Sequence, residues 1–156
     1  MLIRVIAVGT RMPGWVNDAL ADYGARLPAD LQVEWKQIKA EPRASAGSAA
    51  QWLDREAARI RLALPAGATV VALDERGQDL DSAGLARTLA RWREAAKPVA
   101  VLIGGPDGLQ PGLKAAADQN IRLSSLTLPH AMVRVLWAEQ LFRAWSMLAH
   151  HPYHRV

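Results

Sequence analysis

Five short apolar segments alternate with stretches of helical periodicity, and this alternation restricts the fold more than any other feature of the chain. The segments cover residues 2–8, 31–38, 69–73, 99–103 and 121–123. Residues 2–8 are rich in β-branched residues, 69–73 and 99–103 are continuously apolar, and 31–38 alternates apolar with polar residues as a half-buried strand does. Strands that alternate with helices predict an α/β fold with a single, mainly parallel sheet flanked by helices. A chain of 156 residues can bury one sizeable core but not two, so we expect one domain over residues 1–156.

The predicted helices begin and end at recognisable residues. Pro13 opens the first helix and Pro28 stops it. Ser48 is the expected N-cap of a second helix that reaches about residue 64, and Asp81 or Ser82 is expected to cap a third. Between the second strand and the second helix, the segment KAEPRASAGS (Lys39 to Ser48) has no period, so we interpret it as a loop whose role the sequence leaves open.

Helical periodicity also assigns side chains to inner and outer faces. The expected inner face of the first helix consists of Trp15, Val16, Ala19, Leu20, Tyr23 and Leu27. The expected outer face of the second helix is charged and consists of Asp54, Arg55, Glu56, Arg59 and Arg61. Most of the six tryptophans are therefore interpreted as core or dimer packing rather than base stacking.

The stretch from Leu123 to Trp145 combines two kinds of sequence. It begins as an uncharged, strand-like run with hydroxyl groups between leucines, passes through Pro129 and continues as a helix that is apolar on more than one face. Such a helix has more apolar surface than one sheet can cover. We therefore expect it to pack on its own sheet and on a second molecule.

Composition excludes several classes of function. The chain has no cysteine, which excludes a disulfide scaffold, a thiolate zinc site and a cysteine nucleophile. The N-terminus lacks the features of a signal peptide and no apolar run approaches membrane-spanning length, so we expect a soluble cytoplasmic protein without membrane contact. The formal net charge of +4 suits a polyanionic partner such as RNA without requiring one.

Three strand ends predict a ligand pocket. The turn IGGPDG, with Gly104, Gly105 and Gly108, follows an apolar strand but is neither a Walker loop nor a GxGxxG motif. If Leu73, Gly104 and the run from Leu123 to Leu128 end neighbouring strands, they form one pocket at the carboxyl edge, suited to an adenine ring and a small polar tail. No catalytic dyad accompanies it, which favours a reaction whose electrophile is already activated by a cofactor.

The C-terminal residues offer a second group of candidates. Glu139 and Arg143 have the i, i+4 spacing of a helix ion pair. His130, at a helix start, is either a solvated first-turn residue or a substrate contact. The tail residues Tyr153, His154 and Arg155 are either a frayed terminus or a grip for a base and its phosphates. The histidines have no cysteine or suitably spaced carboxylate with them, so no metal site is expected.

Three motifs together closely resemble the RlmH family of bacterial methyltransferases, over nearly the whole chain. They are AVGTRMPGWV near the start, VLIGGPDGL in the middle and LSSLTLPHAMVRVLWAEQLFRAWSMLAHHPYHR at the end. This family methylates N3 of a pseudouridine in 23S ribosomal RNA and belongs to the SPOUT class. The resemblance implies S-adenosyl-L-methionine as methyl donor, a homodimer, and a C-terminal trefoil knot threaded by the last helix.

The resemblance also implies site residues. It assigns the cofactor pocket to Leu73, Gly104, Leu123, Ser124, Ser125, Leu126, Thr127 and Leu128. By position, we nominate His130, Tyr153, His154 and Arg155 for substrate contact or proton transfer. The expected substrate is a ribosome or large subunit that already carries the pseudouridine. The alternatives are a SPOUT tRNA ribose methyltransferase and a non-catalytic α/β dimer that binds RNA.

Overall fold

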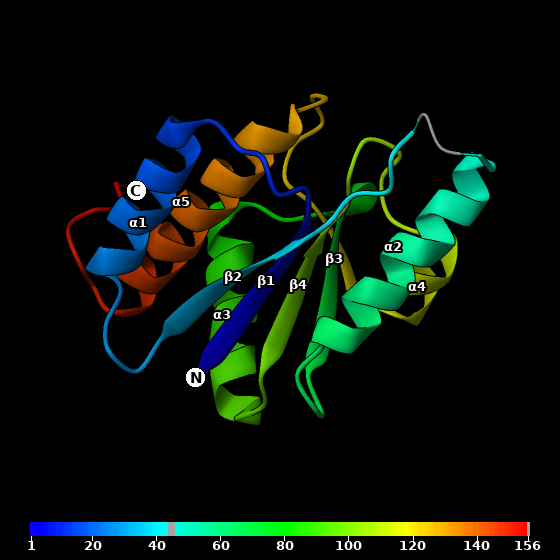
Figure 1. The fold of residues 1–156 in the computed structure, drawn as a ribbon. Coiled ribbons are helices and arrows are strands. Elements are labelled where there is room, and N and C mark those ends of the chain that lie inside the picture. The colour runs from blue at the N-terminus through cyan, green and yellow to red at the C-terminus, as the bar shows by residue number, and fades with distance from the viewer. Residues whose placement is uncertain (44–45, 156) are drawn as a thin grey trace.

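A computed structural model describes residues 1–43 and 46–155 and contains a five-stranded sheet (Figure 1). The strand order is β2-β1-β4-β3-β5, and every pair of neighbours is parallel. The strands are β1 (Leu2–Val8), β2 (Gln32–Ile38), β3 (Thr69–Asp79), β4 (Val99–Ile103) and β5 (Gln119–Arg122). The predicted α/β class and parallel sheet are therefore confirmed. All five strands point the same way, so their carboxyl ends lie along one edge.

The helices form a layer on each face of the sheet (Figure 1). One layer consists of α1 (Gly14–Arg26), α3 (Ser82–Ala95) and α5 (His130–Leu148), and the other of α2 (Ala49–Ala63) and α4 (Pro111–Ala116). Strand β1 shows why both layers are needed. Its residues Ile3 and Val5 belong to the core under the first layer, whereas Ile6 belongs to the core under the second. A strand covered on both faces has the continuous apolar sequence seen here.

Helix α5 lies between α1 and α3 and packs against both. Trp137 and Leu141 in its middle are fully buried. Two apolar side chains in the first turns of these helices stay exposed. Met132 of α5 is 36% exposed and Trp15 of α1 is 51% exposed. In the described part of the chain, no helix has the length and apolar character needed to cross a bilayer.

The predicted caps of the helices are confirmed. Ser48 Oγ accepts a hydrogen bond from the Gln51 backbone N–H, and the Gln51 side chain accepts one from the Ser48 N–H. This reciprocal arrangement is a capping box, which satisfies two donors that the first turn of α2 leaves free. At α3, Asp81 rather than Ser82 is the N-cap, and its carboxylate accepts from the Gly84 N–H at 2.7 Å.

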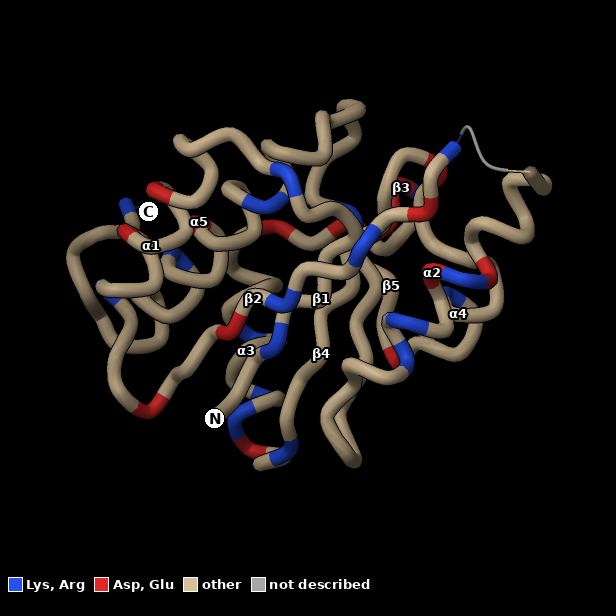
Figure 2. Tube along the Cα trace, viewed as in Figure 1, with Lys and Arg blue, Asp and Glu red and all other residues tan. Residues whose placement is uncertain are grey.

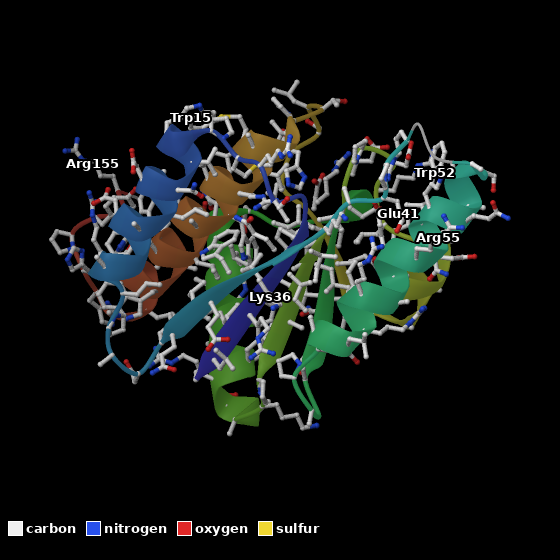
Figure 3. The ribbon with its side chains drawn as sticks, in the orientation of Figure 1. Trp15, Lys36, Glu41, Trp52, Arg55 and Arg155 are labelled. Atoms are coloured by element: carbon white, nitrogen blue, oxygen red, sulfur yellow. The ribbon has the colours of Figure 1, made fainter. Side chains whose placement is uncertain are left out.

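Three sequence predictions are wrong. Trp15 was expected on the inner face of its helix, but it projects from the surface at the beginning of α1 (Figure 3). Strand β3 does not stop at Leu73 but continues to Asp79, with a shift in its pairing to β5. Glycine makes this possible, because a Cβ at Gly77 would lie 2.7 Å from the backbone of Ile121. Glu56 was expected on the outer face of α2, but it is 2% exposed.

The burial of Glu56 accounts for the beginning of the loop from Lys39 to Ser48. Glu56 Oε2 accepts a hydrogen bond from the Glu41 backbone N–H at 2.9 Å. Glu41 is itself buried, and its carboxylate pairs with Arg55 and Arg59 of α2. Figure 3 shows Glu41 beside α2. The first residues of the loop are thus packed on the helix, while Ala44 and Ser45 lie outside the described residues.

Candidate functional site

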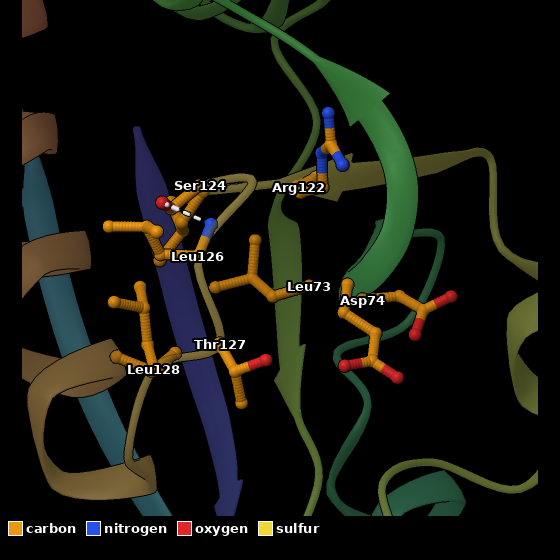
Figure 4. Close-up of a pocket in the computed structure, with 10 residues that line it drawn as sticks. Leu73, Asp74, Arg122, Ser124, Leu126, Thr127 and Leu128 are labelled. Atoms are coloured by element: carbon orange, nitrogen blue, oxygen red, sulfur yellow. Dashed lines mark hydrogen bonds between the residues drawn. The ribbon is translucent and has the colours of Figure 1, made fainter.

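Two adjoining cavities open at the carboxyl edge of β3 and β4. The larger has a volume of about 410 Å³ and lies beside the glycine turn, and the smaller, of about 90 Å³, lies beside the run after β5 (Figure 4). They share four lining residues, which are Leu73, Asp74, Glu75 and Val133. The three segments predicted to form one pocket therefore do meet, although they line two adjoining cavities and Leu73 lies within β3 rather than at its end. Their combined size lies within the range of sites for small molecules and cofactors.

The run from Leu123 to Leu128 forms a wall of the smaller cavity (Figure 4). Ser124 Oγ accepts a hydrogen bond from the Leu126 backbone N–H at 2.9 Å, which fixes a turn in a segment without regular secondary structure. Of the residues nominated for the cofactor, Leu73, Leu123, Ser124, Leu126, Thr127 and Leu128 line this cavity and Gly104 lines the larger one. Ser125 is exposed and lines neither of them.

The glycine turn forms a side of the larger cavity. Gly104 must be a glycine, because a Cβ there would lie 2.4 Å from the carbonyl carbon of Gly108. The turn closes on a hydrogen bond from the Gly108 N–H to the Gly105 carbonyl oxygen at 2.9 Å. Its backbone thus approaches the cavity without a side chain in between, as the sequence predicted.

Two carboxylates at the centre of the site were missed by sequence reasoning. Asp74 and Glu75 directly follow Leu73 in β3 and line both cavities. Lys114 of α4 lies 3.7 Å from Asp74 and also lines the larger cavity. The signal was available, since charged residues directly after an apolar parallel strand lie at its carboxyl end. These carboxylates make the cavity suitable for a cationic ligand or for hydroxyl donors.

His130 connects α5 to the glycine turn. Its Nδ1 lies 2.8 Å from the carbonyl oxygen of Gly104, and its Nε2 lies 2.8 Å from Nε of Arg134. An arginine Nε–H can only donate, so Nε2 must be the unprotonated nitrogen and Nδ1–H must donate to Gly104. Burial first and the Arg134 charge second lower the pKa of His130 below its usual value of 6.5. The imidazole is neutral and both of its nitrogens are engaged.

Arg134 is the buried cation behind His130. The residue is 1% exposed, and its Nη2 donates to the carbonyl oxygen of Gly9 at 2.8 Å and to that of Val8 at 3.4 Å. Among residues 1–43 and 46–155, no carboxylate lies within ion-pair distance of it. Burial lowers the pKa of this guanidinium. Sequence reasoning missed Arg134, although it stands four residues after His130 in an otherwise apolar stretch.

The tail residues Tyr153, His154 and Arg155 lie away from the two cavities. Tyr153 Oη donates to Glu139 Oε1 at 3.0 Å, and the Tyr153 ring stands edge-on to Phe142 with centroids 4.6 Å apart. Burial first, then Tyr23 and Glu139, raise the pKa of Tyr153. His154 Nδ1 lies 3.3 Å from Ser146 Oγ. The tail is therefore packed on the second half of α5 and is not frayed.

A separate cavity of about 280 Å³ is lined by His154, Arg155 and Arg143, among others. None of the three tail candidates lines the two cavities at the strand ends. The structure thus brings His130 to the predicted pocket but not Tyr153, His154 or Arg155. The predicted ion pair is confirmed, because Arg143 Nη2 lies 2.6 Å from Glu139 Oε1. Within the described residues, no group of three His, Asp or Glu side chains is arranged to hold a metal ion.

Comparison with known proteins assigns the chain to a family. The family model described as "Predicted SPOUT methyltransferase" matches residues 1–154. A protein of Bordetella avium named "Ribosomal RNA large subunit methyltransferase H" is 58% identical over 156 residues, which is 100% of both chains. A protein of Ralstonia nicotianae with the same name is 54% identical over the same length.

The fold of this chain resembles those of solved structures. A probable methylase family protein from Haemophilus influenzae superposes with a TM-score of 0.60 at 12% identity, over 99% of this chain and 70% of that one. A probable methyltransferase from Bordetella pertussis superposes with a TM-score of 0.59 at 19% identity, over 91% of this chain and 95% of that one. With the family model matching almost every residue and full-length relatives above half identity, the chain belongs to the SPOUT methyltransferase family.

Proposed function

We propose that the protein transfers a methyl group from S-adenosyl-L-methionine to N3 of a pseudouridine in large-subunit ribosomal RNA, on an assembled ribosome or subunit. The observation that carries the proposal is the pair of cavities where Leu73, Gly104 and the run from Leu123 to Leu128 meet. The full-length relatives named for ribosomal RNA support this substrate class. Family membership further supports the trefoil knot expected for the C-terminal part of the chain.

The lining of the cavities fits this cofactor. Aliphatic side chains of Leu73, Leu123 and Val133 offer an apolar surface for a flat ring, and the backbone at Gly104 is open to close approach. The carboxylates of Asp74 and Glu75 suit ribose hydroxyls and positive charge. The cofactor, when bound, supplies a methyl group that is already an activated electrophile.

The protein's own contribution is then mainly positioning. A methyl transfer requires the donor and the acceptor nitrogen to be held in line at near-attack distance, and we assign this task to the walls of the cavity. His130 fixes the carbonyl of Gly104 and has no free nitrogen to accept a proton. We infer that His130 positions the glycine turn, and that the proton on N3 of the base leaves to water. The guanidinium of Arg155, if the tail of a second copy meets the cavity, would stabilise the resulting negative charge of the base.

The position of the tail supports a homodimer. Helix α5 has 19 residues and therefore spans about 28 Å at 1.5 Å per residue. The cavities adjoin its first turn, whereas Tyr153 packs on its second half, and Arg155 projects from that side of the molecule (Figure 3). A tail that contributes to the reaction must therefore meet the cavity of a second copy. The exposed Trp15, Met132 and Leu126 offer apolar surface for that contact.

The charge distribution supports a shaped substrate rather than free RNA. In the view of Figure 2, the Lys and Arg positions are intermingled with Asp and Glu positions along the chain. With a formal net charge of only +4, attraction to free RNA would be weak and easily screened by salt. A ribosomal surface offers shape as well as phosphates.

The test is to incubate the protein with radiolabelled S-adenosyl-L-methionine and intact ribosomes that lack the modification, and then to locate the methyl group. We expect label at N3 of a pseudouridine in large-subunit RNA. A parallel incubation with unmodified tRNA tests the alternative methyltransferase, which label on the tRNA ribose would establish. Binding of ribosomes without any incorporation would identify a non-catalytic RNA-binding protein.

A further inference from the structure

We propose that Arg43, from the loop before α2, is a positioning residue that holds the glycine turn of the cofactor cavity through Asp107. The inference rests on the proposed function, because it assumes that the larger cavity binds the cofactor. It assigns a role to the described beginning of a loop that the sequence left without one.

The anchor of this arrangement is the buried carboxylate of Glu56 on α2. Its side chain is 3% exposed, and Oε2 accepts hydrogen bonds from Nη1 of Arg43 at 2.8 Å and from the Glu41 backbone N–H at 2.9 Å. A buried carboxylate is costly unless a cation and further donors surround it. Glu56 therefore fixes both the backbone of the loop and the guanidinium of Arg43.

The other side of the guanidinium reaches the turn. Nε of Arg43 donates to Asp107 Oδ2 at 2.8 Å, and Asp107 lines the larger cavity. Nη1 also donates to the carbonyl oxygen of Glu41 at 2.7 Å. The guanidinium passes close to the turn itself, since a Cβ built on Gly105 would lie 3.9 Å from Nη2 of Arg43. Arg43 thus connects α2 to the cavity wall.

The Arg43 side chain is held more firmly than the cation of an ordinary surface ion pair, although the Asp107 carboxylate is 38% exposed. The Arg43 side chain is only 26% exposed, and its guanidinium lies 5.5 Å from the ring centroid of Trp52. Two carboxylates on two different segments approach separate nitrogens of one rigid fork. Lysine carries a single ammonium and cannot reproduce this fork. Arg43 is therefore suited to set the position of Asp107, and not merely to neutralise it.

Loss of the contact should weaken cofactor binding while leaving the reacting atoms intact. A turn that is no longer held must be ordered when the ligand binds, and that ordering lowers affinity. We expect a 5–10-fold higher dissociation constant for S-adenosyl-L-methionine, on the order of 1 kcal/mol at 1.4 kcal/mol per tenfold. The turnover number of Arg43→Lys at saturating cofactor should be unchanged, because Arg43 lines neither cavity and the bound turn has the same structure.

The experiment compares Asp107→Asn, Arg43→Lys and the double variant in the full-length protein by calorimetric titration with S-adenosyl-L-methionine. If Arg43 acts through Asp107, each single variant weakens binding and the double variant is no weaker than the worse single one. Asp30→Asn is the matched control, because Asp30 pairs with Arg93 at 2.5 Å across a similar sequence separation but lines neither cavity. Its affinity should equal that of the unmodified protein.

Two outcomes would overturn the proposal. In the first, Arg43→Lys binds S-adenosyl-L-methionine with normal affinity and Asp107→Asn binds it weakly, which would mean that Asp107 contacts the cofactor without help from Arg43. Normal affinity in both would show that the turn needs no support. If Arg43→Lys fails to fold, Arg43→Gln with Glu56→Gln removes both buried charges together and must show the same loss. An unmodified protein that does not bind the cofactor would contradict the proposed function instead.

Discussion

Helix α5 carries two arginines, each four residues after a polar partner, and the two pairs are held in opposite ways. At the amino end, Arg134 is buried and bonded to His130 and to backbone carbonyls, with no carboxylate at hand in the described structure. Further along, Arg143 pairs with Glu139, and the two side chains remain 31% and 14% exposed. The same spacing thus produces a buried, carboxylate-free network beside the cavity and a partly solvated ion pair beneath the tail.

The difference shows what each end of the helix has to do. A buried cation bound only by neutral acceptors tolerates little change, because each lost bond leaves a buried polar group without a partner. It therefore fixes the end of β1, the first turn of α5 and Gly104 as one unit. A partly exposed ion pair contributes less, because water can replace some of its contacts. The tail that is proposed to meet a second molecule and its RNA is therefore held by weaker contacts than the amino end.

The largest expected effect is that of Arg134→Met. The substitution leaves the carbonyl groups of Val8 and Gly9 and the Nε2 of His130 without their donor, so we expect a loss of about 3 kcal/mol or more in the free energy of unfolding. Arg143→Met should cost about 1 kcal/mol or less. Urea denaturation of both variants at one protein concentration compares them. Equal losses would contradict the distinction between the two ends.

The amino end should also respond to pH, and the carboxyl-end ion pair should not respond in the same range. The pKa of His130 is lowered in the folded protein, mainly by burial and then by Arg134. The unfolded chain, with a histidine pKa near 6.5, therefore binds a proton more readily, and stability falls as the pH drops below about 6.5. His130→Asn should flatten this part of the profile. Urea midpoints between about pH 5 and pH 7.5 measure it, and an unaltered slope in the variant would exclude His130 as the cause.

The sequence predicted those features that depend on hydrophobic periodicity and on residues that begin or end helices and strands. The apolar strands, the Ser48 cap and the Glu139–Arg143 pair follow from local rules, and the three strand ends were grouped because parallel strands share an edge. The network of Arg134 could not be predicted, because its partners are carbonyl groups 125 and 126 residues away. Any backbone position offers a carbonyl, so no residue type marks the contact in advance.

The prediction that Glu56 lies on an exposed face was wrong for a related reason. Helical periodicity gives the direction in which a side chain points, but it does not tell whether another segment covers that direction. The loop residues Glu41 and Arg43 cover Glu56, and a charged outer face became a buried anchor. Trp15 shows the reverse case, because it belongs to the apolar stripe of α1 and the described chain nevertheless leaves it 51% exposed. The proposed homodimer would cover it with a second molecule.

Tyr153→Phe tests whether the tail at the carboxyl end of α5 contributes to the reaction or only to stability. The variant keeps the ring and loses the hydroxyl, with its hydrogen bond to Glu139, so the unfolding free energy should fall by about 1 kcal/mol. Cofactor affinity should be unchanged, because the ring lies outside both cavities, whereas methyl transfer to ribosomes should fall several-fold if the tail grips the substrate. His130→Asn should do the opposite and weaken cofactor binding first. A tyrosine variant with full transfer activity would remove that hydroxyl from the mechanism.

Glu139→Gln should have the smallest effect and tests whether charge matters at the carboxyl end. The glutamine amide oxygen still accepts from Tyr153 and Arg143, but the amide NH2 replaces the oxygen that accepts from Gln140, so the variant loses the ion pair and that one hydrogen bond. Because Arg143 remains partly solvated, we expect a change of about 0.5 kcal/mol in unfolding free energy, decreasing further as salt screens the pair. The measurement is urea denaturation at low and high salt. A loss comparable to that of Arg134→Met would show that this end, too, depends on a buried charge, and would require the tail to be a fixed part of the fold rather than an adaptable one.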